Sequence, residues 1–313
     1  MIALVCPGQG SQTPGFLAPW LELPGLRERA EALSDAAGVD LVTHGTTSDA
    51  DTIRDTAVAQ PLIVGAGLLA LDALYADSPD TLASSAGVVA GHSVGEITAA
   101  AATGVLTPQD AMSLVSLRGR AMAAASAITP TGMSAVLGGD PAEVAAALDR
   151  HGLTPANMNG AGQVVAAGTL DQLAALAADP PAKARVIPLQ VAGAFHTVHM
   201  APAADELSDQ WSDHDVSDPG VTLLSNTDGV AVATGAEFLG RLISQVRNPV
   251  RWDLCMETMT ELGVTGLVEL APAGTLVGLA KRAMKGVPTV ALKTPDDLDA
   301  ARELLAASTS AKA

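Results

Sequence analysis

The chain has 313 residues, 48% of them hydrophobic, so it is longer than one average domain and can bury a large core. Its formal net charge of -17 and its 2% of aromatic residues argue against nucleic acid and anionic membrane surfaces as partners. Two cysteines, Cys6 and Cys255, provide no disulfide framework, and the first residues lack the basic segment of a signal peptide, so a cytoplasmic location is expected.

The first part of the chain alternates short apolar runs with helical patterns. The run at 2–6 predicts a buried strand, and the run at 87–90 predicts another. Such alternation predicts a mainly parallel sheet with helices on both faces. Apolar stretches such as Gly65–Leu71 are too short to span a bilayer. Helical spacing of apolar residues is found at 26–37, 61–75 and 111–127.

After Met133 the predicted elements become shorter and form a β-α-β-α-β series. This series predicts a small α+β subdomain of residues 129–192, inserted into a larger α/β unit of residues 1–128 and 193–313. Its expected elements are a strand at 134–137, a helix at 141–151, a strand at 163–167, a helix at 170–178 and a strand at 184–189. Later strands, at 266–270 and 287–292, return to the larger unit.

The run Gly91-His92-Ser93-Val94-Gly95 has the pattern of a nucleophile elbow. An apolar strand precedes it and a helical pattern follows it, so Ser93 is expected on a sharp turn with its hydroxyl exposed. The free N–H groups at the start of that helix would face an oxyanion formed at the serine. The alternative is an ordinary strand-to-helix turn with a serine N-cap.

A nucleophilic serine needs a base, and two histidines are candidates. His196 and His199 both follow the exit of the small subdomain, where a cleft between subdomains is expected. Either can instead be an ordinary histidine at the start of a helix. Their spacing also fits two metal ligands, but no H-E-x-x-H motif or cysteine pair accompanies them, so we expect no metal site.

Several short motifs occur in a fixed order between residue 7 and about residue 275. They are Pro7-Gly8-Gln9-Gly10-Ser11-Gln12, Gln60-Pro61, Gly91–Glu96, Leu117–Met122, Asn157–Gln163, Ala194-Phe195-His196-Thr197 with Met200, and Asn248–Trp252. This ordered set resembles that of the malonyl-CoA:acyl carrier protein transacylases. The resemblance implies an α/β-hydrolase-like large subdomain with a parallel sheet, interrupted by a small ferredoxin-like subdomain.

The resemblance also implies a ping-pong reaction. Ser93 would take the malonyl group from coenzyme A as nucleophile and pass it to the phosphopantetheine thiol of an acyl carrier protein. His196 would be the base, oriented by a backbone carbonyl in the turn at Asn248-Pro249. No cofactor is expected, since malonyl-CoA is a substrate.

The same resemblance assigns roles to the pocket. Arg118 would bind the malonyl carboxylate, which suits the planar donor pair of a guanidinium, although a surface arginine is the alternative. The backbone N–H groups of Gln9 and Val94 would form the oxyanion hole. A nucleotide-binding loop at Gln9 is the other interpretation, but the segment has neither phosphate-loop pattern. Gln60, Met122 and Asn159 match pocket positions, and Met122 can equally be core filling.

We therefore expect a cytoplasmic, monomeric malonyl transferase of fatty-acid or polyketide synthesis that meets its carrier protein in trans. Two alternatives stay open: a serine esterase or thioesterase with water as acceptor, and a non-catalytic scaffold that binds carrier protein. Acyl carrier proteins are typically acidic, so the segment 241–285, with six basic and four acidic residues, is the candidate docking region, and solvated surface charges near unrelated acids are the alternative.

Overall fold

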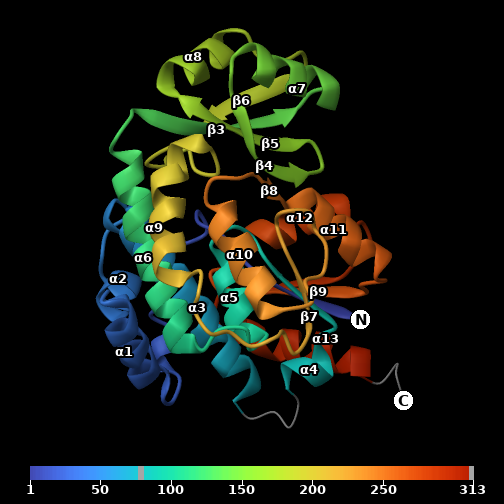
Figure 1. Cartoon of the computed structure of the whole chain (residues 1–313). Helices are drawn as coiled ribbons and strands as arrows, with labels where there is room; N and C mark the ends of the chain where they lie inside the picture. Colours follow the sequence, from blue (N-terminus) through green and yellow to red (C-terminus); the bar gives the residue numbers. More distant parts are fainter. Residues whose placement is uncertain (77–80, 310–313) are drawn as a thin grey trace.

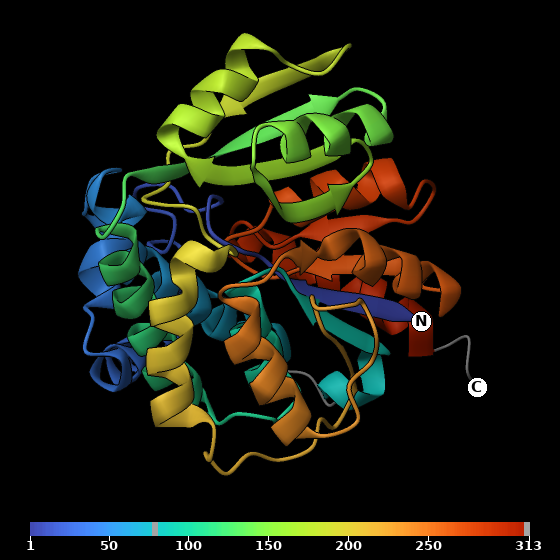
Figure 2. The ribbon, with the colours of Figure 1, turned by 45° about the horizontal axis from the view of Figure 1, so that its top comes forward.

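The structure is a computed structural model that describes residues 1–76 and 81–309. Its elements form two five-stranded sheets, each with its own helices (Figure 1). The turned view in Figure 2 shows the second sheet, with its two helices, as a layer above the larger unit. The expected α/β fold with a parallel sheet and an inserted α+β unit is confirmed.

The larger sheet is parallel throughout the described residues. Its order is β10 (Thr289–Ala291), β9 (Gly266–Glu269), β1 (Ile2–Cys6), β2 (Val88–Gly91) and β7 (Thr222–Leu224). A central parallel strand is buried on both faces, and β1 follows this rule. Leu4 packs into the core on one face, whereas Ala3 and Val5 pack into the core on the other.

Helices cover both faces of this sheet, as the alternating pattern predicted. The core on one face is built from α1 (Leu26–Ala37), α2 (Leu41–Thr46), α3 (Thr56–Tyr75), α5 (Gly95–Ala102), α6 (Pro108–Ser126), α9 (Ala201–Trp211), α10 (Gly235–Gln245) and α13 (Leu298–Thr309). The core on the other face uses α11 (Trp252–Glu261) and α12 (Thr275–Ala283). Short elements complete the unit: α4 (Leu82–Ser85), η1 (Trp20–Glu22), η2 (Thr52–Arg54), η3 (Val198–Met200) and η4 (Pro295–Asp297).

Helix α3 corrects two expectations. It begins at Thr56 rather than at Pro61, because the Asp55 carboxylate caps it by accepting the N–H of Ala57 at 2.8 Å. With 20 residues it is also long and apolar enough to cross a membrane, so the expectation that every apolar stretch is too short was wrong. However, 78% of its most apolar window is buried inside the molecule, which is the position of a core helix.

The second sheet has the order β6 (Ala184–Pro188), β3 (Thr131–Gly138), β5 (Gln163–Thr169), β4 (Thr154–Gly160) and β8 (Val250–Arg251). The first four strands are antiparallel and, with α7 (Pro141–Arg150) and α8 (Leu170–Ala178), give the order β-α-β-β-α-β of a ferredoxin-like unit. The predicted series lacked β4, because its asparagines, proline and two register shifts hide the alternating pattern.

Strand β8 joins the two units. It lies between the larger unit's helices α10 and α11 in the chain, yet it pairs in parallel with β4, where Asn157 faces Val250. The polar residues of β4 are thereby held against the carboxyl ends of the large sheet. The division of the chain at residues 128/129 and 192/193 stays a prediction.

Candidate active site

Ser93 lies on the sharp turn between β2 and α5 that the sequence predicted. Its backbone has φ +55°, a left-handed conformation that is strained for a residue with a side chain. A Cβ atom at Gly91 would collide with the backbone of Gly95, and one at Gly95 would collide with the backbone carbonyl of Cys6. Glycine at both positions therefore lets the helix approach the strands closely enough to present Ser93 at its start.

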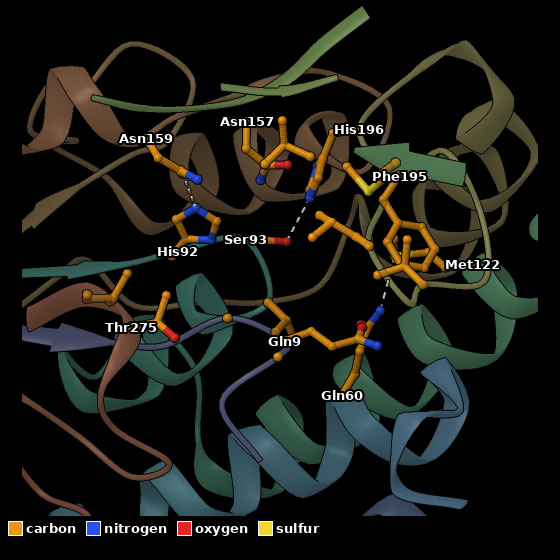
Figure 3. A pocket seen from close by; sticks show the side chains of 18 of the residues that line it. Gln9, Gln60, His92, Ser93, Met122, Asn157, Asn159, Phe195, His196 and Thr275 are labelled. Carbon is orange, nitrogen blue, oxygen red and sulfur yellow. Dashed lines mark hydrogen bonds between the residues drawn. The ribbon is translucent and has the colours of Figure 1, made fainter. Parts of the chain in front are cut away.

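His196 is the histidine that meets Ser93. Its Nε2 lies 2.8 Å from Ser93 Oγ (Figure 3). Its Nδ1 lies 2.9 Å from the backbone carbonyl oxygen of Gln245. A carbonyl oxygen only accepts, so Nδ1 carries the ring proton and Nε2 is free to accept the Ser93 hydroxyl. His199, the other candidate, is absent from the residues that line this cavity.

The charge state of His196 follows from its burial. The side chain is 3% exposed, and this burial, with the nearby Arg118 charge, lowers the pKa of His196 to about 3. At neutral pH the imidazole is therefore uncharged and can take a proton. The Gln245 carbonyl opposes the shift, because it accepts a hydrogen bond from the protonated ring as well.

The carbonyl that orients His196 corrects the expectation at Asn248. Gln245 is the last residue of α10, and the last carbonyls of a helix have no partner inside it. The Gln245 carbonyl accepts the Asn248 N–H at 3.1 Å, and its second lone pair accepts the imidazole N–H. Asn248 is exposed, and its side-chain amide donates to the Ser244 carbonyl at 2.7 Å. The Asn248 backbone raises the pKa of His196, but less than the Gln245 carbonyl does.

Arg118 places a buried positive charge beside the serine. The side chain is 2% exposed; Nη1 donates to Gln60 Oε1 at 2.6 Å, and Nη2 donates to Ser93 Oγ at 3.3 Å. Burial lowers the pKa of Arg118 to about 10, so it stays protonated at neutral pH. Among the described residues no carboxylate lies within 4.0 Å of its guanidinium, so Arg118 can take a carboxylate from a ligand.

One cavity of about 260 Å³ collects almost all of the predicted side chains. Gln60, whose Nε2 donates to Met122 Sδ at 3.3 Å, lies on one side, and Asn159, whose Oδ1 is 2.9 Å from His92 Nε2, lies on the other (Figure 3). The predicted residues that line the cavity are Gln9, Gln60, Ser93, Val94, Arg118, Met122, Asn159 and His196. Asn248 does not line it.

Two backbone N–H groups flank the serine. Gln9 follows β1, and Val94 is the N-cap residue of α5, so both sit at carboxyl ends of neighbouring parallel strands. No acceptor for either N–H group lies among the described residues. This pair is available to an oxygen atom held near Ser93.

Within residues 1–76 and 81–309, no group of three or more His, Cys, Asp or Glu side chains is placed to hold a metal ion. The two cysteines are buried free thiols, Cys6 in β1 and Cys255 in α11.

The sequence patterns did not reveal the residues that lie behind Ser93 and His196. Asn226 and Gln245 bind the backbone of Ser93 and the ring of His196, and Glu96 lies buried beside Asn226. Burial raises the pKa of Glu96 to about 8. The apolar run at 221–224, followed by Ser225-Asn226, was the available signal for a strand with a polar residue at its carboxyl end.

Comparisons with known proteins show the family of this chain. The acyl transferase domain family matches residues 3–307. The chain is 55% identical to the malonyl CoA-acyl carrier protein transacylase of Mycobacterium bovis over 299 residues, 96% of this chain and 98% of that protein. The crystal structure of MCAT from Mycobacterium tuberculosis superposes with a TM-score of 0.92 at 54% identity, covering 97% of this chain and 99% of the other.

A solved complex is also similar. It holds the malonyl-transacylase PlMCAT together with AntF, a type II PKS acyl-carrier protein in its holo form. This structure matches with a TM-score of 0.89 at 29% identity, over 96% of this chain and 99% of that one.

Proposed function

The chain belongs to the acyl transferase domain family and is an acyl-carrier-protein S-malonyltransferase, and from this premise we propose a ping-pong reaction on Ser93 and His196. The observation that carries the proposal is the contact of Ser93 Oγ with a neutral His196 Nε2 inside a cavity that also holds the buried charge of Arg118.

In the first half-reaction, Ser93 Oγ attacks the thioester carbonyl of malonyl-CoA while His196 Nε2 takes the hydroxyl proton. The resulting oxyanion accepts hydrogen bonds from the N–H groups of Gln9 and Val94. When the intermediate collapses, the carbon–sulfur bond breaks and His196 returns the proton to the departing coenzyme A thiolate. The product is a malonyl ester on Ser93 and neutral His196.

The second half-reaction runs the same steps with a new thiol. The phosphopantetheine thiol of the acyl carrier protein gives its proton to His196 and attacks the ester carbonyl. Collapse of this intermediate breaks the bond to Ser93 Oγ, which recovers the proton from His196. The malonyl group leaves as a thioester of the carrier protein.

Arg118 supplies the selectivity. Its guanidinium pairs with the free carboxylate of the malonyl group through two hydrogen bonds, whereas an acetyl group leaves the buried charge without a partner. Gln60 holds the guanidinium from the far side through Oε1, and Met122 and Asn159 shape the wall. The esterase alternative would bind the same malonyl group and differs in its acceptor, which is water instead of the carrier-protein thiol.

The docking surface for the carrier protein is the basic end of α12, defined as Lys281, Arg282 and Lys285. The other basic side chains of the segment 241–285 are in ion pairs: Arg241 with Asp228 and Glu237, Arg247 with Asp205, and Arg251 with Asp253. The basic end of α12 is exposed, and the start of the same helix lines the cavity through Thr275 and Leu276. An acidic partner bound there would have the cavity within reach of its thiol arm.

We also propose that the enzyme needs no metal or other cofactor, acts as a cytoplasmic monomer, and supplies malonyl groups for fatty-acid or polyketide synthesis. The small unit of residues 129–192 then acts as one wall of the acyl cavity.

Intact-mass spectrometry after mixing with malonyl-CoA tests the proposal. We expect a mass increase of one malonyl unit on Ser93, lost when holo acyl carrier protein is added and unaffected by a chelator. Ser93→Ala should acquire no label. A labelled Ser93→Ala protein would show that another residue is the nucleophile, and release of malonate without carrier protein at the transfer rate would favour the hydrolase.

A further inference from the structure

Asn226 stands at the carboxyl end of β7, one residue beyond Ser225, and its side chain is fully buried at 0% exposure. Strand β7 pairs in parallel with β2, where Leu224 faces Ala90. The carboxyl ends of parallel neighbours meet at the same edge of the sheet, so Asn226 lies directly behind the turn that carries Ser93. It does not line the acyl cavity.

The Asn226 side chain binds the backbone of Ser93 and the side chain of Gln245, the residue whose carbonyl holds His196. Its Oδ1 accepts the Ser93 backbone N–H at 2.8 Å and the Gln245 Nε2–H at 3.0 Å, and its Nδ2 donates to the Gly91 carbonyl at 2.7 Å. The reverse orientation of the amide would set donor against donor at two of these contacts, so the assignment of Oδ1 and Nδ2 is unambiguous.

The backbone of Asn226 is held just as firmly. Its N–H donates to Glu96 Oε1 at 2.8 Å, and Glu96 lies in the first turn of α5. Its carbonyl accepts the N–H of Arg251 at 2.8 Å, in the strand that pairs with β4. Asn226 thus connects the helix after Ser93 to β8, the neighbour of the strand β4 that carries the polar wall of the cavity.

Ser93 and His196 are both strained, with φ +55° and +61°. Such conformations cost about 1–3 kcal/mol each and persist only where the surroundings enforce them. Ser93 is held by Asn226 directly. His196 is held by the Gln245 carbonyl, and the Gln245 side chain is held by Asn226. The buried amide of Asn226 therefore holds Ser93 directly and His196 through Gln245.

We infer that Asn226 is a positioning residue that keeps Ser93 Oγ within hydrogen-bond distance of His196 Nε2, acting through the Ser93 backbone and through Gln245. The inference rests on the proposed function. Asn226 touches neither the acyl group nor the thiol, so its loss should slow acylation without changing which acyl group is preferred. A misplacement of about 1 Å in such a pair costs roughly a hundredfold in rate.

Two variants test the inference. Asn226→Ala removes all the side-chain contacts. Gln245→Met keeps the backbone carbonyl that binds His196 and the length of the side chain, but removes the donor to Asn226. Ser225→Ala is the matched control, because Ser225 is about as buried in the same turn, at 1% exposure, and within the described residues its hydroxyl hydrogen-bonds only to Thr227.

The assay is single-turnover acylation of Ser93, followed by rapid quench and intact-mass spectrometry with malonyl-CoA and with acetyl-CoA. Thermal unfolding identifies the variants that are folded. We expect the acylation rate constant to fall roughly a hundredfold for Asn226→Ala and roughly tenfold for Gln245→Met, by the same factor for both acyl groups. Ser225→Ala should stay within threefold of the unmodified protein.

The outcomes separate the inference from the proposed function. If the unmodified protein does not acquire malonate on Ser93, the proposed function fails. If it does, and the folded variants react within threefold of its rate, the positioning role is overturned. A loss confined to malonyl-CoA also overturns it, because that result places the effect on the carboxylate site. Should Asn226→Ala not fold, Gln245→Met decides alone.

Discussion

Replacement of Arg118 by alanine is the sharpest test of substrate selection. The guanidinium of Arg118 is 2% exposed and has no carboxylate partner within 4.0 Å among the described residues. A malonyl carboxylate bound there is therefore buried beside the positive charge of Arg118. Breaking a buried charge pair by removing one partner costs about 3–5 kcal/mol. At about 1.4 kcal/mol per factor of ten, that is a loss of roughly a hundredfold to several thousandfold in kcat/KM for malonyl-CoA.

Acetyl-CoA responds differently, because it never pairs with the guanidinium. We expect Arg118→Ala to lose less than about tenfold toward acetyl-CoA, from the lost contact to Ser93 Oγ alone. The preference for malonyl over acetyl should therefore collapse. Single-turnover acylation with the two thioesters measures the ratio directly, with no need for carrier protein.

Arg120→Ala is the control, since Arg120 lies two residues further along α6, is exposed, and contacts Ser116 rather than the cavity. It should leave both rates unchanged. Equal losses toward malonyl-CoA and acetyl-CoA in Arg118→Ala would refute the reasoning, because they would make Arg118 a structural residue. A second readout is the pH profile: the Arg118 charge lowers the pKa of His196, so its removal should move the acidic limb for acetyl transfer to higher pH.

Three further predictions follow from other parts of the structure. Because burial lowers the pKa of His196 from its ordinary value to about 3, kcat/KM for acylation should stay level as the pH falls from 7.5 to about 5, and a limb centred near pH 6.5 would contradict a buried neutral imidazole. Changing all three residues of the basic end of α12 to glutamate should raise the KM for carrier protein and flatten its salt dependence, while acylation by malonyl-CoA stays normal. An unchanged KM at low salt would show that the carrier protein docks elsewhere. Arg27→Glu, on the exposed face of α1, is the control. Gly95→Ala should lower the free energy of unfolding by about 2 kcal/mol or more, because the new methyl group meets the backbone carbonyls of Cys6 and Pro7. In Gly240→Ala, within α10, the methyl group meets nothing within 4 Å and should raise the free energy of unfolding by up to about 1 kcal/mol. Calorimetry on both variants measures the two effects.

Local chemistry explains what could be predicted. The elbow at Ser93 is encoded within a few residues, because glycine at two positions and an apolar run before them are enough to specify a strand, a sharp turn and a helix. The helices at 26–37 and 170–178 were predicted with their observed ends, since both carry a clear apolar period. The assignments at Arg118 and Gln9 needed the ordered motifs as well, because neither residue differs locally from a surface arginine or a turn glutamine.

Other features depend on segments far apart in the chain. Strand β4 was missed because its polar residues face a cavity rather than a core, and β8 because two residues form a strand only when β4 lies beside them. The carbonyl that binds His196 was placed three residues too late, because the end of α10 decides which carbonyl lies beside the imidazole. The apolar length of α3 could not by itself distinguish a core helix from a membrane span.

The sequence by itself therefore predicted the sharp turn at Ser93, because a few adjacent residues specify it, and the ordered motifs added His196 and Arg118 to the predicted site. Only the tertiary structure decided how they meet. Ser93 and His196 are separated by 103 residues, and their Oγ and Nε2 atoms come within 2.8 Å of each other. That approach depends on parallel strands that end at one edge of the sheet and on the buried amide of Asn226, which contacts Ser93 directly and His196 through Gln245. Such contacts arise from packing between distant segments, and no local pattern encodes them.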